Sequence, residues 1–218
     1  MPQSPIDLAI ALAPPTARAA LTALFALDAR LAEVASSTRE PTLGQLRLAW
    51  WRDALDRLDR APTPAEPTLR ALENLVLLHG VTGADLSGMA AGWEAIVAGP
   101  TPDLAALVEY GTARGSALFG AAARVLGTHI NARIDAAGRG WAVAEIMRRW
   151  SDPTLIALAR GQASSSFDEA FATAWPSAER TLGILALLAM HDIAEGDAVP
   201  GRLRSATMFI KFRVTGKR

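Results

Sequence analysis

Three aspartates, Asp53, Asp56 and Asp59, recur at every third position in the segment LAWWRDALDRLDR. Carboxylates that recur in this way can hold magnesium ions for a diphosphate substrate. On a helix, however, each step of three residues turns by about 300°, so the three side chains drift around the cylinder. Asp53 and Asp56 also each precede an arginine by four residues, an order that favours surface ion pairs. We therefore interpret the aspartates as the solvated face of a helix.

The elements that must position these side chains are helices. Alanine and leucine dominate, no stretch alternates with period two, and apolar residues recur at intervals of three and four. The first expected helix follows Pro14 and Pro15 and ends at the break SSTREP. The second runs from about Leu43 to Asp59, with Trp51 on its apolar stripe. Further helices are expected over 82–98, 101–126, 131–150 and 177–193, with two shorter ones that start at 151 and 166.

Length and composition favour a single all-α helical bundle over residues 1–218. Half of the residues are hydrophobic, which is enough for a sizeable core. Lysine plus arginine equals aspartate plus glutamate at 22 each, which gives no indication of a nucleic-acid partner. The chain has no cysteine, which excludes disulfides, thiolate chemistry and cysteine-ligated zinc.

The apolar segments predict a cytoplasmic protein without a transmembrane segment. The N-terminal MPQSPIDLAIALAPP has no basic region ahead of its short apolar run, unlike a signal peptide. The most apolar segment, residues 181–190, is about half of the roughly 20 residues that span a bilayer. The basic C-terminal segment, residues 201–218, either makes weak peripheral contact with a membrane or partner, or is an ordinary final helix packed on the bundle.

Other polar groups have simpler interpretations. HDIAEGD, residues 191–197, brings three carboxylates to an expected helix end, where they either belong to a glycine-containing exit loop or bind a metal ion. Arg114 lies in an otherwise small and apolar stretch, from which it could reach a central cavity, although surface arginines are commoner. The serines of RGQASSSF have no partnered histidine and give no support to nucleophilic hydrolysis.

Four segments together resemble the squalene/phytoene synthase family, the all-α head-to-head prenyl synthases. LAPPTARAALTALFALDARLAEV resembles the first conserved helix of that family, and EPTLGQLRLAWWRDAL resembles the tryptophan-arginine segment of the next helix. LAALVEYGTARGSALFGAAARVLG resembles a tyrosine-containing helix, which implies a substrate-binding role for Tyr110. RSATMFIKFRVTGKR fits the basic ending of one branch. The resemblance implies a bundle of the isoprenoid synthase type.

In active members of that family, two aspartate-rich motifs on facing helices hold magnesium ions and the diphosphates of the substrates. The first motif falls on residues 31–36. There Ala32 and Ser36 replace the two bracketing aspartates, and only Glu33 is acidic. Asp28 stands one turn earlier, where active members need no metal ligand.

The second motif falls after GRGWAVAEIMRRW, where active members carry an aspartate directly after an arginine. Here Trp150 follows Arg149, and Asp152 is the only nearby carboxylate. The resemblance therefore implies a divergent member of the family in which neither motif is intact.

Three functions are open at this point. The first is a non-catalytic scaffold or assembly protein, without a cofactor, that binds a protein partner or a prenyl or lipid-like ligand. FALD and RLAWWRD resemble the branch that includes a mitochondrial factor for assembling respiratory complex I. The second is an active, magnesium-dependent prenyltransferase in which other carboxylates replace the missing ligands and arginines grip the diphosphates. The third is a helical interaction domain unrelated to isoprenoids.

The candidate substrate-binding residues are Arg18, Asp28, Glu33, Tyr110, Arg149 and Asp152.

Overall fold

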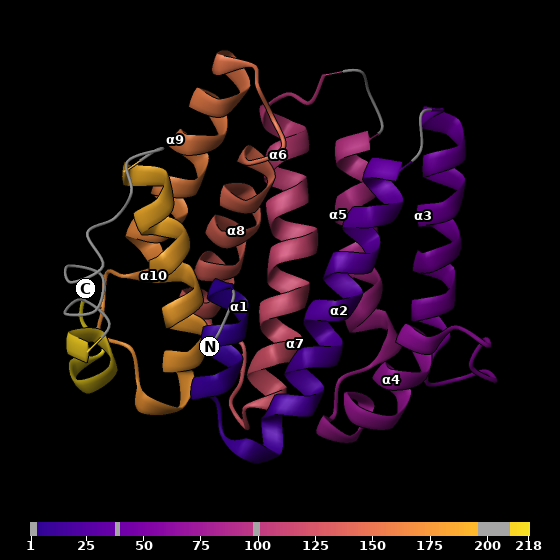
Figure 1. Cartoon of the computed structure of the whole chain (residues 1–218), viewed down its shortest axis with the longest axis horizontal. Coiled ribbons are helices and arrows are strands. Elements are labelled where there is room, and N and C mark those ends of the chain that lie inside the picture. Colours follow the sequence, from indigo (N-terminus) through magenta and orange to yellow (C-terminus); the bar gives the residue numbers. More distant parts are fainter. Residues whose placement is uncertain (1–3, 38–39, 98–100, 196–209) are drawn as a thin grey trace.

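The computed structural model describes residues 4–37, 40–97, 101–195 and 210–218 (Figure 1). Every regular element in these residues is a helix, which confirms the all-α class. The α-helices are α1 (Pro5–Leu12), α2 (Pro15–Ser37), α3 (Pro41–Asp56), α4 (Pro67–Leu75), α5 (Gly83–Val97), α6 (Leu104–Tyr110), α7 (Ala117–Val125), α8 (Ala132–Met147), α9 (Pro153–Ala170) and α10 (Arg180–Glu195). Two short 3₁₀ segments, η1 (Leu77–His79) and η3 (Ser177–Glu179), and the π-helical η2 (Gly111–Ser116) complete the set.

Proline and small polar side chains set the helix starts. α2 begins at Pro15 as predicted, and α1, α3, α4 and α9 also begin at a proline, whose missing N–H costs nothing in the first turn. The predicted cap of α8 is confirmed, because the side chain of Asn131 accepts a hydrogen bond from the backbone N–H of Ile134 at 3.1 Å.

The helix boundaries predicted at Asp59 and Ser166 are wrong. The second helix was expected to reach Asp59, but α3 ends at Asp56 and the chain then turns. A new helix was expected from Ser166, but α9 runs without interruption through this residue. The hydroxyl of Ser166 donates to the carbonyl of Gln162 at 3.1 Å, so it is satisfied inside the helix and caps nothing.

The helices pack side by side around one hydrophobic core. α6, η2 and α7 follow one another as a single rod near the middle of the bundle, with α8 against this rod (Figure 1). α9 and α10 cover α8, whereas α3 packs on α5 and α2 at the opposite edge. The core extends from Ala9 in α1 to Phe212 near the C-terminus. None of the described helices is both long and apolar enough to cross a membrane.

Glycines let three segments approach closely in the middle of the bundle. A Cβ on Gly115 of η2 would lie 2.2 Å from the carbonyl oxygen of Gly138 in α8. A Cβ on Gly92 of α5 would lie 2.7 Å from the backbone nitrogen of Arg114. Because no side chain separates these backbones, η2 lies directly between α5 and α8, and Arg114 is held at the centre.

Candidate functional site

The centre of the bundle holds a buried ion pair between α2 and η2. Arg114 Nε donates to Asp28 Oδ1 and Arg114 Nη2 donates to Asp28 Oδ2, each at 2.6 Å. The two side chains are only 4% and 8% exposed. Such a two-point contact satisfies both carboxylate oxygens, which compensates for the cost of removing the charges from water.

Aromatic rings and a tyrosine hydroxyl complete this centre. Arg114 Nη1 donates to the hydroxyl of Tyr110 at 2.5 Å and to the carbonyl of Ala142 at 3.2 Å. The guanidinium carbon of Arg114 lies 4.9 Å from the ring centroid of Trp93 and 4.8 Å from that of Trp141. Aromatic rings and hydrogen-bond acceptors therefore surround the guanidinium of Arg114. We call Asp28, Tyr110, Trp93, Arg114 and Trp141 the central cluster.

Burial and pairing shift the pKa values of Tyr110 and Arg114 in the central cluster. Burial raises the pKa of the Tyr110 hydroxyl above its ordinary value, so the hydroxyl stays neutral. For Arg114, burial opposes the charged form, but the carboxylate of Asp28 raises the pKa above its ordinary value. The guanidinium therefore stays charged.

Arg149 lies beside the central cluster on its exposed side. Its guanidinium carbon is 5.4 Å from the ring centroid of Trp93, which in turn meets Tyr110 edge to face at 5.2 Å. The indole N–H of Trp93 is buried and has no hydrogen-bond partner among the described residues. The guanidinium of Arg149 and an indole N–H without a hydrogen-bond partner among the described residues therefore both lie at Trp93.

The structure brings three of the six predicted substrate-binding residues, Asp28, Tyr110 and Arg149, to this region and gives the other three local contacts. Glu33 pairs with Arg30 at 2.6 Å, and its side chain is 63% exposed. Asp152 caps α9 and accepts from the backbone N–H of Thr154 at 2.7 Å. Arg18 Nε donates to the carbonyl of Ala13 at 3.0 Å.

The pairing of Arg114 is the feature that the sequence left open. Of the two positions considered for Arg114, the interior one is correct, because the residue is only 3% exposed. The signal was the place of Asp28 on the apolar stripe of α2, between Leu27 and Leu31, which are both fully buried. A buried carboxylate requires a partner, and an arginine in an apolar stretch supplies one.

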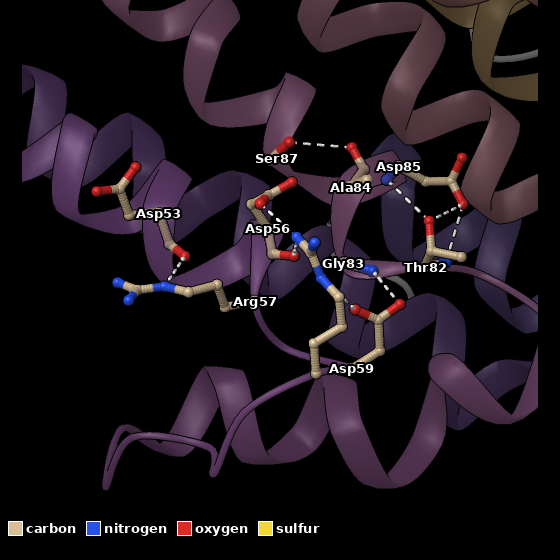
Figure 2. Close-up of polar contacts among 10 residues, drawn as sticks. Asp53, Asp56, Arg57, Asp59, Thr82, Gly83, Ala84, Asp85 and Ser87 are labelled. Atoms are coloured by element: carbon tan, nitrogen blue, oxygen red, sulfur yellow. Dashed lines mark hydrogen bonds and ion pairs between the residues drawn. The ribbon is translucent and has the colours of Figure 1, made fainter.

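The aspartates of residues 53–59 contact separate groups, as Figure 2 shows. Asp56 pairs with Arg60 at 2.5 Å, which confirms one expected ion pair. The expected pair between Asp53 and Arg57 is wrong, because Arg57 Nε donates instead to the backbone carbonyl of Asp53 at 3.2 Å. Asp59 accepts from the backbone N–H of Gly83 at 3.2 Å and so ties the end of α3 to the start of α5.

The carboxylates of the described residues do not gather in one place. In the part of the chain that the structure describes, no three histidine, aspartate or glutamate side chains form a group that could hold a metal ion. Of the carboxylates in HDIAEGD, Asp192 contacts Arg148 at 3.3 Å, while the side chain of Glu195 and residue Asp197 lie outside the described residues.

The described part of the basic C-terminal segment packs on the bundle. Phe212 is fully buried, and its ring centroid is 5.9 Å from that of Phe171 and 6.3 Å from that of Trp175. The backbone N–H of Trp175 donates to the carbonyl of Gly216 at 2.8 Å. Residues 201–209 of this segment lie outside the described residues.

Comparison with known proteins agrees with this architecture. No curated protein and no solved structure matches the chain. A family model described as squalene/phytoene synthase matches residues 4–160, which include the central cluster and both positions of the aspartate-rich motifs. The all-α isoprenoid synthase fold of that family is the fold described above, so the resemblance is not an accident of alanine-rich helices. Since the match covers well over half of the 218 residues, the chain belongs to the squalene/phytoene synthase family.

Proposed function

We propose that this protein is a non-catalytic member of the family that acts as a scaffold or assembly protein for a protein partner or a lipid-like ligand. The supporting observation is the direction of the acidic side chain at the first motif position. Glu33 pairs with Arg30 and lines a groove between α2 and α3, whereas the neighbouring Ala32 is buried in the core. Carboxylates that hold magnesium must converge on one cavity, and Glu33 faces another side of its helix.

The second motif position supports the same proposal. Asp152 uses one carboxylate oxygen for the backbone N–H groups of Thr154 and Leu155, at 2.7 and 3.3 Å. This carboxylate stabilises the first turn of α9. In addition, the carboxylate of Asp28 is fully occupied by Arg114. The three acidic residues that would have to replace the missing ligands are therefore each committed to another group.

An active prenyltransferase is the second candidate, and one observation favours it. Arg149 is exposed next to Trp93, whose buried N–H lacks a partner among the described residues. A guanidinium and an N–H donor side by side are suited to a diphosphate oxygen. If this candidate is correct, Arg149 binds the substrate, and magnesium ligands come from elsewhere in the chain.

Calorimetric titration with a non-hydrolysable farnesyl diphosphate analogue, with and without magnesium, separates the two candidates. The non-catalytic proposal predicts no binding, or binding that magnesium does not change. Tight binding that requires magnesium and is lost in Arg149→Met would overturn it. Arg148→Met is the matched control, because the neighbouring Arg148 is already paired with Glu145 and Asp192.

A further inference from the structure

Helix α3 carries large apolar side chains on its outer surface. Leu43, Leu46 and Trp50 are 41%, 64% and 48% exposed, and their spacing of three and four residues places them along one flank of the helix. α3 lies at the edge of the bundle, where it packs on α5 and α2 among the described elements (Figure 1). We call Leu43, Leu46 and Trp50 the α3 stripe. Its regular spacing distinguishes it from scattered exposed leucines.

A groove of about 490 Å³ runs between α2 and α3 beside the α3 stripe. Trp50 belongs to both the groove and the stripe, so the two form one continuous surface. Arg30 and Arg47 line the groove, and Glu33 is the carboxylate among its described lining residues. The formal charges of these three lining residues, two arginines and one glutamate, sum to a net positive charge.

We propose that this surface binds an acidic amphipathic helix of a partner protein. Apolar residues of such a helix at three- and four-residue spacing would cover the α3 stripe, and one of them would enter the groove beside Trp50. Carboxylates along the edge of that helix would meet Arg47 and the free edge of Arg30. The inference rests on the scaffold role proposed above and specifies the class of partner.

The shape and size of the surface favour a helix over two other occupants. A flat bilayer surface would not fill a concave groove between two helices. A small anion would contact the arginines but leave Leu43 and Leu46 exposed to water. A helix matches both the α3 stripe and the charged groove, because it carries a row of apolar side chains with charged side chains on either side.

Binding of a synthetic helical peptide tests the proposal. The peptide, of about 18 residues, carries leucine at three- and four-residue intervals with glutamate on both flanks, and its twin carries lysine in place of every glutamate. We expect the glutamate peptide to bind at least about tenfold more tightly than the twin, and a Leu46→Ser/Trp50→Ser variant to lose about tenfold or more. Leu78→Ser is the control, since Leu78 is 79% exposed on η1, outside the α3 stripe.

A charge-reversal variant adds a test in which the binding of one peptide is expected to increase. Arg47→Glu should weaken the glutamate peptide and strengthen the lysine twin, a result that unfolding of the variant cannot produce. Failure of the glutamate peptide to bind, or equal binding of the two peptides, would overturn the proposal. So would unchanged binding in the double variant.

Two other results would assign the surface to a different occupant and also overturn the proposal. One is a dimer in sedimentation velocity that Leu46→Ser dissociates. The other is co-sedimentation with phosphatidylglycerol vesicles that the same substitution abolishes. The diphosphate titration stays independent of these tests. Magnesium-dependent binding of the analogue would remove the scaffold role, whereas peptide binding would still show whether the helix-docking surface exists.

Discussion

A carboxylate on the buried face of α2 is tolerated because Arg114 meets both of its oxygens. Breaking one side of such a pair leaves an uncompensated charge in the core, whereas removing both sides does not. The central cluster is therefore sensitive to which partner is removed. Tyr110 adds to this sensitivity, because its hydroxyl accepts a third hydrogen bond from the same guanidinium.

We predict that Arg114→Met and Asp28→Leu each lower the free energy of unfolding by about 3 to 5 kcal/mol. The double variant should lose less than the sum of the two single losses, because no buried charge then lacks a partner. Urea unfolding followed by far-ultraviolet circular dichroism measures all three values. A double variant whose loss of unfolding free energy equals the sum of the two single losses would contradict this prediction.

The exposed pair of Arg30 and Glu33 is the control for this cycle. The two side chains are 43% and 63% exposed, so water screens their attraction. Arg30→Met and Glu33→Gln should each change the free energy of unfolding by less than about 1 kcal/mol. The two Arg→Met variants should therefore differ in effect, because one arginine is buried with its partners and the other is exposed.

The sequence predicted the surroundings of this pair better than the pair itself. Apolar periodicity identified the buried stripe of α2, which includes Leu24 and Leu31. The contact between Asp28 and Arg114, however, joins residues separated by 86 positions. Periodicity describes one helix at a time, so it cannot show which helices meet. Only the packing of η2 against α2 determines that contact.

At the scale of elements, the packing of η2 depends on glycines more than on helix propensity. η2 is a π-helical turn inserted between α6 and α7, and turns of this kind are often found at functional sites. The sequence predicted one uninterrupted helix over 101–126. The extra residue rotates an apolar stripe by about 100°, but the mostly small residues of GTARGSA, 111–117, form no clear stripe in which this rotation could be read.

We predict that Gly115→Ala lowers the free energy of unfolding by about 1 to 3 kcal/mol. The added Cβ would lie 2.2 Å from the carbonyl oxygen of Gly138, so the backbones of η2 and α8 must separate. Gly161→Ala is the matched control, since Gly161 lies inside α9 with no atom within 4 Å of an added Cβ. This second variant should gain up to about 1 kcal/mol from helix propensity. Urea unfolding of both variants provides the comparison, and similar effects would argue against close packing at Gly115.

The start of α5 makes stability depend on pH. The backbone N–H of Thr82 donates to Asp85 Oδ2 at 2.8 Å, and the hydroxyl of Thr82 donates to the same oxygen at 2.7 Å (Figure 2). Burial opposes ionisation of Asp85, but these hydrogen bonds and the nearby Arg124 outweigh it and lower its pKa below the ordinary 3.8. The unfolded chain therefore binds more protons than the folded chain as the pH falls below about 3.8.

We predict that Asp85 contributes stability above pH 3.8 and that this contribution is lost as the pH falls through the lower pKa of the folded state. Asp85→Asn should therefore be less stable than the unmodified chain at neutral pH, and the difference should shrink below about pH 3.8. Urea unfolding at several pH values between about 3 and 7 measures the difference. A difference that stays constant with pH would show that the charge of Asp85 is not involved.

At the scale of the whole molecule, family membership explains the arrangement of the helices. It does not determine the function, which depends on particular side chains. The C-terminal ends of α2 and α8 lie at the same end of the bundle (Figure 1). The two motif positions are therefore at the same end of the bundle. The fold alone does not decide function. The proposal of a non-catalytic scaffold rests on the directions of Glu33 and Asp152, and the sequence shows the residue types at these positions but not where they point.

The described C-terminal residues pack on the bundle through Phe212. We predict that Phe212→Ala lowers the free energy of unfolding by about 3 to 5 kcal/mol. Phe212 is fully buried against Phe171 and Trp175, so its removal leaves a cavity in the core. Ile210→Ala is the control two residues away, because Ile210 is 66% exposed and should cost less than about 0.5 kcal/mol. Urea unfolding followed by tryptophan fluorescence measures both variants. Equal effects would mean that the segment lies on the surface and is available to a membrane or partner.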